Sequence, residues 1–176
     1  MATKPTIYKC RIDLSDLNRN HYETLNLTVA LHPSETLERM MARIITYCIN
    51  IREHLIFSKG ISDPDEPALW QHSLNGNLEL WIDVGEPQID RIKKASNIAR
   101  EVLVYSFNHK AETWWQQNRD QFNKLKATFY RFDWTQIQTL SRLVERTMAL
   151  SITLTGDSAY VTTDKGDCEL GWVELT

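Results

Sequence analysis

Residues 78–84 carry the clearest pattern in the chain, an alternation of aliphatic residues with other side chains. Leu78, Leu80, Ile82 and Val84 are separated by Glu79, Trp81 and Asp83. Successive side chains of a strand point to opposite faces, so the four aliphatic residues share one face and both carboxylates lie on the other. The pattern predicts a strand with a buried aliphatic face and with Asp83 close to its end.

A helix is predicted directly after this strand, because Gly85 and Pro87 interrupt the extended run. Ile89, Ile92, Ala95 and Ala99 then recur at helical spacing, and Arg91, Lys93 and Lys94 fall in the first turns. Residues 102–107 are apolar at nearly every position, which is typical of a strand covered on both faces. We therefore predict a parallel strand–helix–strand crossover of right-handed topology.

The rest of the chain also divides into strands and helices. Alternation predicts an antiparallel hairpin of residues 6–13 and 22–31, joined by the turn sequence SDLNRN. Further predictions are a helix from an N-cap at Ser34 to about Phe57, a hairpin turning at Asn75–Gly76, a helix over 108–122, a strand over 126–133, a helix that begins with an Asp133/Gln136 capping box, and three strands within 150–175.

These elements predict an α/β protein. We expect one compact domain over residues 1–176, with a mixed sheet, helices on both of its faces, an N-terminal hairpin and a C-terminal β-meander. A chain of 176 residues with 42% hydrophobic residues is long enough to bury a substantial core.

Charge and cysteine content limit the classes of function. A net charge of −3 disfavours a general polyanion-binding surface, although a local basic cluster remains compatible with it. The three cysteines are widely spaced and predict neither a disulfide framework nor a structural zinc site. The chain shows no signal-peptide pattern and no membrane-length apolar stretch, so we expect a cytoplasmic protein without membrane contact, and a monomer.

Glu38 lies on the apolar shoulder of the first predicted helix, beside Ile45 and Ile49. A carboxylate in such a place needs a partner, because an unpaired buried charge is costly. A salt bridge with Arg52 is one explanation, and a functional role for Glu38 is the other. Arg39 and Arg43 are expected to face solvent or an anionic group.

The strings HPSETLERMMARI, LWIDVGEPQIDRIKKA and WWQQN resemble the YaeQ family of small bacterial proteins. The resemblance extends over essentially the whole chain. It implies a fold built around a variant of the PD-(D/E)XK nuclease core. In that core, acids from two strands and a glutamate from the preceding helix hold a metal ion beside the phosphate to be cleaved.

For this chain, the resemblance implies that Glu38, Asp83 and either Asp65 or Glu66, with Glu66 preferred, hold Mg²⁺, an ion that favours oxygen ligands. The metal would neutralise the phosphate and activate a water molecule. Gly85 occupies the position of the motif lysine, which normally stabilises charge in the transition state. Lys94 is our first choice to replace it, with Lys93 and Arg91 as alternatives.

Nucleic acid is the partner that this chemistry implies, with Arg91, Lys93 and Arg43 as phosphate-binding residues. Alternatively, the cations of this helix form ion pairs with Glu86 and Asp90, or lie on a solvated surface. Two functions remain open: a divergent Mg²⁺-dependent nuclease or phosphodiesterase with Glu38, Glu66, Asp83 and Lys94 as its catalytic residues, or an inactive nuclease-like scaffold that binds nucleic acid or a protein partner.

Overall fold

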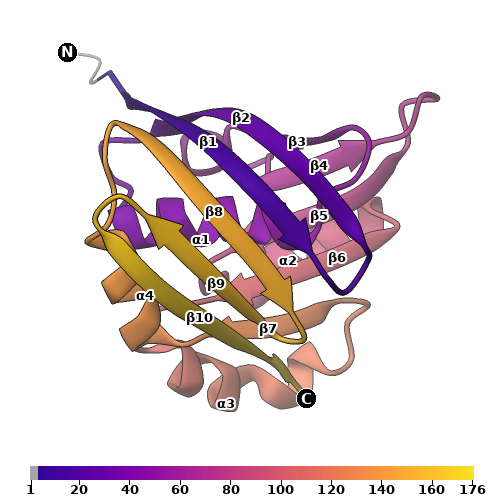
Figure 1. Ribbon diagram of the computed structural model, residues 1–176. Coiled ribbons are helices and arrows are strands. Elements are labelled where there is room, and N and C mark those ends of the chain that lie inside the picture. The colour runs from indigo at the N-terminus through magenta and orange to yellow at the C-terminus, as the bar shows by residue number, and fades with distance from the viewer. Residues whose placement is uncertain (1–3) are drawn as a thin grey trace. The chain divides into compact units, whose positions relative to one another are not determined.

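The computed structural model describes residues 4–176, which form two compact units (Figure 1). Unit 1 extends to Ile49 and resumes over Asp133–Trp172. Unit 2 comprises Asn50–Phe132 and Val173–Thr176, so the last strand of the chain begins in unit 1 and ends in unit 2. Each unit contains strands and helices, which confirms the predicted α/β class.

Unit 1 contains a mixed sheet with the strand order β2-β1-β8-β9-β10. β1 pairs antiparallel with β2 and parallel with β8, and the strands from β8 to β10 form the predicted antiparallel meander. The elements are β1 (Thr6–Asp16), β2 (His21–Leu31), α1 (Leu37–Ile49), α4 (Trp134–Ser141), β8 (Thr147–Thr155), β9 (Ser158–Thr163) and β10 (Gly166–Leu175).

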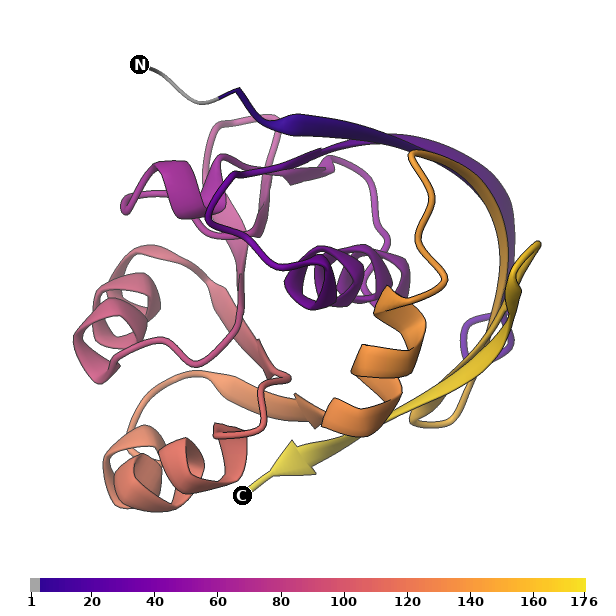
Figure 2. The same ribbon diagram turned by 90° about the vertical axis from the view of Figure 1, so that its left-hand side faces the viewer.

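Both helices of unit 1 lie against the concave face of its curved sheet (Figure 2). Alternate residues of the strands, such as Ile12, Ile152 and Val161, are completely buried on that face, and the residues between them are exposed. Within unit 1, the residues on the convex side of the sheet are exposed, so the two helices of this unit cover only one face. The alternation predicted one buried face but did not show that the other lacks a helix.

α1 differs from the prediction at both of its ends. The amide of Arg39 donates to Thr36 Oγ1 over 3.2 Å. The capping oxygen of the first turn therefore comes from Thr36, two residues after the predicted cap Ser34. The helix ends at Ile49, eight residues before Phe57. The apolar residues beyond it, Ile51 and Leu55, continued the helical pattern and caused the overextension.

A buried ion pair connects the middle of α1 to the segment before it, and a hydrogen bond of the same arginine connects α1 to β2. Arg43 donates to both carboxylate oxygens of Glu35, over 2.8 and 2.7 Å, and to the carbonyl oxygen of Ala30 over 2.9 Å. Arg39 also donates to Glu35. The anionic group expected for Arg39 and Arg43 is thus Glu35, which lies within the chain just before the helix.

The strands of unit 2 follow the order β7-β6-β5-β4-β3 and are also of mixed direction. β5, β6 and β7 are parallel, and β3, β4 and β5 are antiparallel. The elements are β3 (Leu55–Phe57), the short 3-10 helix η1 (Gly60–Ser62), β4 (Leu69–His72), β5 (Leu78–Val84), α2 (Ile89–Ile98), β6 (Glu101–Ser106), α3 (Ala111–Phe122) and β7 (Thr128–Phe132).

The parallel crossover β5-α2-β6 is present as predicted. A cluster that includes Trp81 of β5, Ile92 of α2 and Trp115 of α3 packs the helices against the strands. Leu80 and Ile82 are completely buried on the opposite face of β5. Among the described residues, no helix combines the length and the apolar character needed to cross a bilayer.

Asp133 begins α4 in unit 1, and its Oδ1 accepts a hydrogen bond from the amide of Gln136 over 2.9 Å. The capping box forms only in this direction, because the Gln136 side chain accepts instead from the amide of Gly171 over 2.7 Å. Replacement of Asp133 by Ala should lower the free energy of unfolding by about 1 kcal/mol, the usual cost of a lost N-cap.

Urea denaturation followed by circular dichroism measures this loss. Asp133→Asn keeps an acceptor oxygen at the cap and should cost only a few tenths of that amount. Equal destabilisation by the two substitutions would contradict the assigned cap.

Candidate functional site

Asp83 is held by a two-point ion pair within unit 2. The guanidinium of Arg91, from the first turn of α2, donates through Nε to Oδ2 over 3.1 Å and through Nη2 to Oδ1 over 3.0 Å. Alternation along β5 turns Asp83 toward the helix layer, on the same face as Trp81 and Glu79. The acidic face of the strand is therefore paired with the basic helix that follows it.

Arg91 also joins the loop before β4 to this pair. It donates through Nη1 to the carbonyl oxygen of Pro64 over 2.7 Å and through Nη2 to the carbonyl oxygen of Glu66 over 2.9 Å. Its guanidinium carbon lies 5.5 Å from the ring centroid of Trp81, a cation–π distance. One side chain thus connects β5, α2 and the loop of residues 63–66.

The burial of Asp83 makes this ion pair important for the stability of unit 2. The side chain of Asp83 is 6% exposed and that of Arg91 is 30% exposed. A carboxylate so far removed from water depends on its partner, because loss of that partner leaves an uncompensated charge. Asp83 therefore contributes to the packing of α2 on β5.

The side chains of Glu66 and Lys94 point to separate partners. Ser58 donates to Glu66 Oε1, and Lys59 Nζ lies 3.8 Å from Glu66 Oε2. Lys94 Nζ donates to Asp65 Oδ1 over 2.7 Å in an exposed pair. The hydrogen bond and the charge of Lys94 lower the pKa of the Asp65 carboxyl. Lys94 thus bonds Asp65, the acid that we ranked below Glu66.

Lys93 and Arg43, the two other predicted phosphate-binding residues, differ from Arg91 and from each other in their exposure and in their ionic partners. Lys93 is exposed, and its ammonium group makes no hydrogen bond or ion pair among the described residues. Arg43 is 6% exposed and is bound to Glu35 in unit 1. Contact of Arg91, Lys93 and Arg43 with nucleic acid stays a prediction, and of the three only Lys93 has an unengaged charge.

Glu38 belongs to unit 1, whereas Glu66, Asp83 and Lys94 belong to unit 2. Glu38 lies in the first turn of α1, is half-buried, and accepts a hydrogen bond of 3.4 Å from Ser141 Oγ of α4. Ser141 of α4 therefore supplies one of the polar contacts that we expected Glu38 to need.

Comparison with known proteins gives the chain a family. The family model described as YaeQ protein matches residues 1–172. The chain belongs to the YaeQ family. It is 38% identical to the uncharacterized protein YaeQ of Escherichia coli strain K12 over 174 residues, which cover 97% of this chain and 95% of that protein. The uncharacterized protein YaeQ of Salmonella typhi is 37% identical over the same shares of both chains.

Two solved structures of YaeQ proteins share this fold. The YaeQ crystal structure from Xanthomonas axonopodis pv. citri is 30% identical, has a TM-score of 0.93 and covers 98% of each chain. The YaeQ crystal structure from Pseudomonas syringae is 32% identical with a TM-score of 0.92, and covers 98% of this chain and 96% of its own. The YaeQ resemblance of the sequence is thus confirmed.

The acidic residues of this YaeQ chain do not fit a magnesium site as they are arranged. Among residues 4–176, no three His, Cys, Asp or Glu side chains form a group that could hold a metal ion. Both oxygens of Asp83 accept from Arg91, so an ion would have to displace the guanidinium that neutralises this carboxylate. The assignment of Mg²⁺ to Glu38, Glu66 and Asp83 stays a prediction.

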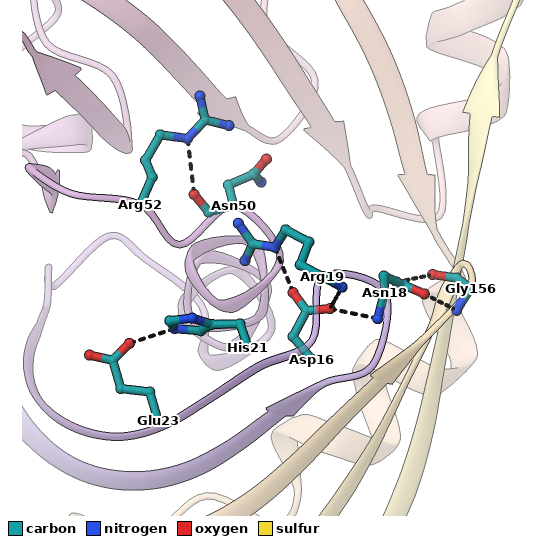
Figure 3. A network of polar contacts seen from close by, with 8 residues as sticks. All are labelled: Asp16, Asn18, Arg19, His21, Glu23, Asn50, Arg52 and Gly156. Carbon is teal, nitrogen blue, oxygen red and sulfur yellow. Dashed lines mark hydrogen bonds and ion pairs between the residues drawn. The ribbon is translucent and has the colours of Figure 1, made fainter.

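A second polar centre, which the sequence did not predict, surrounds Asp16 at the end of β1 (Figure 3). Asp16 is 2% exposed and accepts from Arg19 Nε over 2.8 Å and from the amide of Asn18 over 3.0 Å. The Asn18 side chain exchanges two hydrogen bonds with the backbone of Gly156, over 2.9 and 2.8 Å. The turn composition of the SDLNRN segment was the available sequence signal for this network. The network joins the β1–β2 turn to the β8–β9 turn.

The thiols and one tyrosine are the remaining buried ionisable groups. Burial raises the pKa of Cys10 to about 11 and, together with the charge of Cys10, that of Cys48 to about 12. Burial also raises the pKa of Tyr105, whose hydroxyl accepts from the Asn50 amide over 3.1 Å. High thiol pKa values disfavour thiolate formation at neutral pH, so these cysteines have no features of nucleophiles.

The ion pair of Asp83 and Arg91 predicts coupled losses of stability. Asp83→Ala and Arg91→Ala should each lower the free energy of unfolding by about 2–3 kcal/mol, somewhat less than for a fully buried pair because Arg91 is partly exposed. The double variant should lose clearly less than the sum of the two single losses. Chemical denaturation of the four proteins measures this coupling.

Lys94→Ala is the matched control, because it removes a cation from the same helix but breaks only an exposed pair. It should leave the denaturation midpoint unchanged. Strictly additive losses for Asp83 and Arg91 would show that the ion pair has no structural importance.

Proposed function

We propose that this YaeQ chain is a non-hydrolytic binding scaffold built on a variant of the PD-(D/E)XK nuclease core. The observation that carries the proposal is the pairing of both Asp83 oxygens with Arg91. In a metal-dependent nuclease, the corresponding carboxylate must be free to ligate an ion that retains several waters. Here the carboxylate is committed to the packing of α2.

Gly85 supports this proposal independently of Asp83. It takes the position of the motif lysine and adopts a φ of +133°, a conformation that residues with side chains rarely adopt. A lysine at this position would therefore strain the backbone even though no atom lies close to its Cβ. The local backbone suits the turn from β5 into α2 and disfavours a catalytic lysine at this point.

Lys94 is a weak substitute for that lysine. Its ammonium group already bonds Asp65 over 2.7 Å at the surface, where water competes for both partners. A group that stabilises a phosphate transition state acts most strongly in a preorganised and poorly hydrated site. The exposed position of Lys94 lacks this feature.

A protein is the partner that the charges favour. The chain carries a net charge of −3, and Arg91 and Arg43 are committed to Asp83 and Glu35. Binding of nucleic acid depends largely on cations that neutralise phosphates. Few of the predicted cations remain for that purpose, whereas a protein partner requires no basic excess.

A cleavage assay tests the non-hydrolytic role. The purified chain with Mg²⁺ or Mn²⁺ should not cleave single-stranded or double-stranded DNA or RNA, because the carboxylate of Asp83 stays with Arg91. Labelled substrates on denaturing gels provide the measurement, with Asp83→Asn assayed in parallel. Metal-dependent cleavage by the natural chain that disappears in Asp83→Asn would overturn the proposal and restore the nuclease function.

A binding assay tests the partner class. Labelled single-stranded and double-stranded oligonucleotides should show no saturable change in fluorescence anisotropy with the purified chain at physiological salt. Tight binding that weakens steeply as salt increases would identify nucleic acid as the partner, since such dependence reports released counterions. Lys93→Gln would then show whether its free ammonium group contributes.

A further inference from the structure

The convex face of the unit 1 sheet has an uneven distribution of charge. The outward positions of β2, β8 and β9 are occupied by small, hydroxyl, amide or tyrosine side chains, and none of them is charged. β1, which lies between β2 and β8, presents Lys9, Arg11 and Asp13 on this face. Two cations and one carboxylate therefore lie in a row on β1, between strands whose outward side chains are uncharged.

Lys9 and Arg11 are exposed, and within residues 4–176 their side chains form no hydrogen bond or ion pair. They are two residues apart on one face of the strand, so their Cα atoms lie about 6.6 Å apart. The nearby carboxylate of Asp13 accepts a hydrogen bond from Thr24 Oγ1 over 3.0 Å. Asp13 forms no ion pair with either cation in the described residues, so a bound anion between Lys9 and Arg11 would relieve their mutual repulsion.

Hydrogen-bonding side chains flank these cations across the sheet. Thr28 of β2 and Thr147 of β8 stand in register on either side of Lys9. Asn26 of β2 is the cross-strand partner of Arg11. Hydroxyl and amide groups of this kind donate to anionic oxygens in the gaps between the charged groups.

A hollow with a volume of about 240 Å³ lies at this point of the face. It is lined by Lys9, Arg11, Asn26, Thr28 and Thr147, together with Cys10, Leu27 and Met148. The volume is below the range typical of pockets for drug-sized ligands, so it suits a small group.

We propose that this hollow is a binding site for a phosphate group, either free or as the monoester of a small molecule. A phosphate offers several acceptor oxygens and a charge close to −2, which matches two cations and three neutral donors. A carboxylate has one charge and would satisfy only one of the two cations. The site lies within unit 1 and does not depend on the proposed scaffold function.

Isothermal titration calorimetry of the full chain with inorganic phosphate, phenyl phosphate and acetate tests this site. Saturable binding of phosphate or phenyl phosphate and none of acetate is the expected result. Tighter binding of phenyl phosphate would identify a monoester as the ligand, and equal or weaker binding would identify free phosphate. Absence of saturable binding for both phosphates would overturn the proposal.

Charge-specific variants distinguish a defined site from general electrostatic attraction. Lys9→Gln and Arg11→Gln should each weaken phosphate binding about five-fold, the upper range for one exposed ionic contact. Asp13→Asn should strengthen it, because the amide removes a like charge beside the bound anion and retains an acceptor for Thr24.

Arg142→Gln is the matched control. Arg142 is exposed at the C-terminal end of α4, also in unit 1, but is not part of the hollow. This variant makes the same charge change and should leave the affinity unaltered. A loss equal to that of Arg11→Gln would overturn the proposal in favour of non-specific attraction. Circular dichroism should show that these surface variants fold normally.

Discussion

The ion pair between Asp83 and Arg91 is the interaction on which the arrangement of unit 2 depends. It satisfies a carboxylate that β5 places under α2, and the same guanidinium reaches the carbonyl oxygens of Pro64 and Glu66. A buried charge persists in a protein only where such partners surround it. The strand, the helix and the loop are therefore fixed to one another by a single side chain.

The structural use of Asp83 agrees with the contacts of the neighbouring candidate site residues. In the proposed non-hydrolytic role, a lysine at position 85 would have no phosphate chemistry to serve. Gly85 instead provides the φ of +133° with which the chain leaves β5. Glu66 and Lys94 have partners of their own. Membership of the YaeQ family therefore gives the chain its fold, while these contacts support a role in binding.

The local elements were predictable where one physical signal dominated. Alternation revealed β5, and the spacing of Ile92 and Ala95 revealed α2. The end of α1 was not predictable, because Ile51 and Leu55 continue the apolar pattern although the chain has left the helix. His54, with a φ of 69°, helps to turn the chain there, a conformation that propensity does not reveal.

The partners of the candidate site residues were harder to predict than the elements. The sequence indicated that an acidic strand precedes a basic helix, and that signal was correct. It did not show which cation reaches Asp83, because Arg91, Lys93 and Lys94 share the first turns of α2. Burial resolves this choice: Arg91 reaches the buried carboxylate, while Lys94 bonds an exposed acid and Lys93 faces water. Glu35 likewise precedes its helix, so helical spacing could not pair it with Arg43.

A crystal structure of the chain soaked in Mn²⁺, with anomalous data to locate the ion, tests the central claim most directly. Arg91 should still bond both oxygens of Asp83, and no Mn²⁺ should lie beside them. Anomalous density for Mn²⁺ on Asp83, with the guanidinium displaced, would contradict the structural role of this carboxylate.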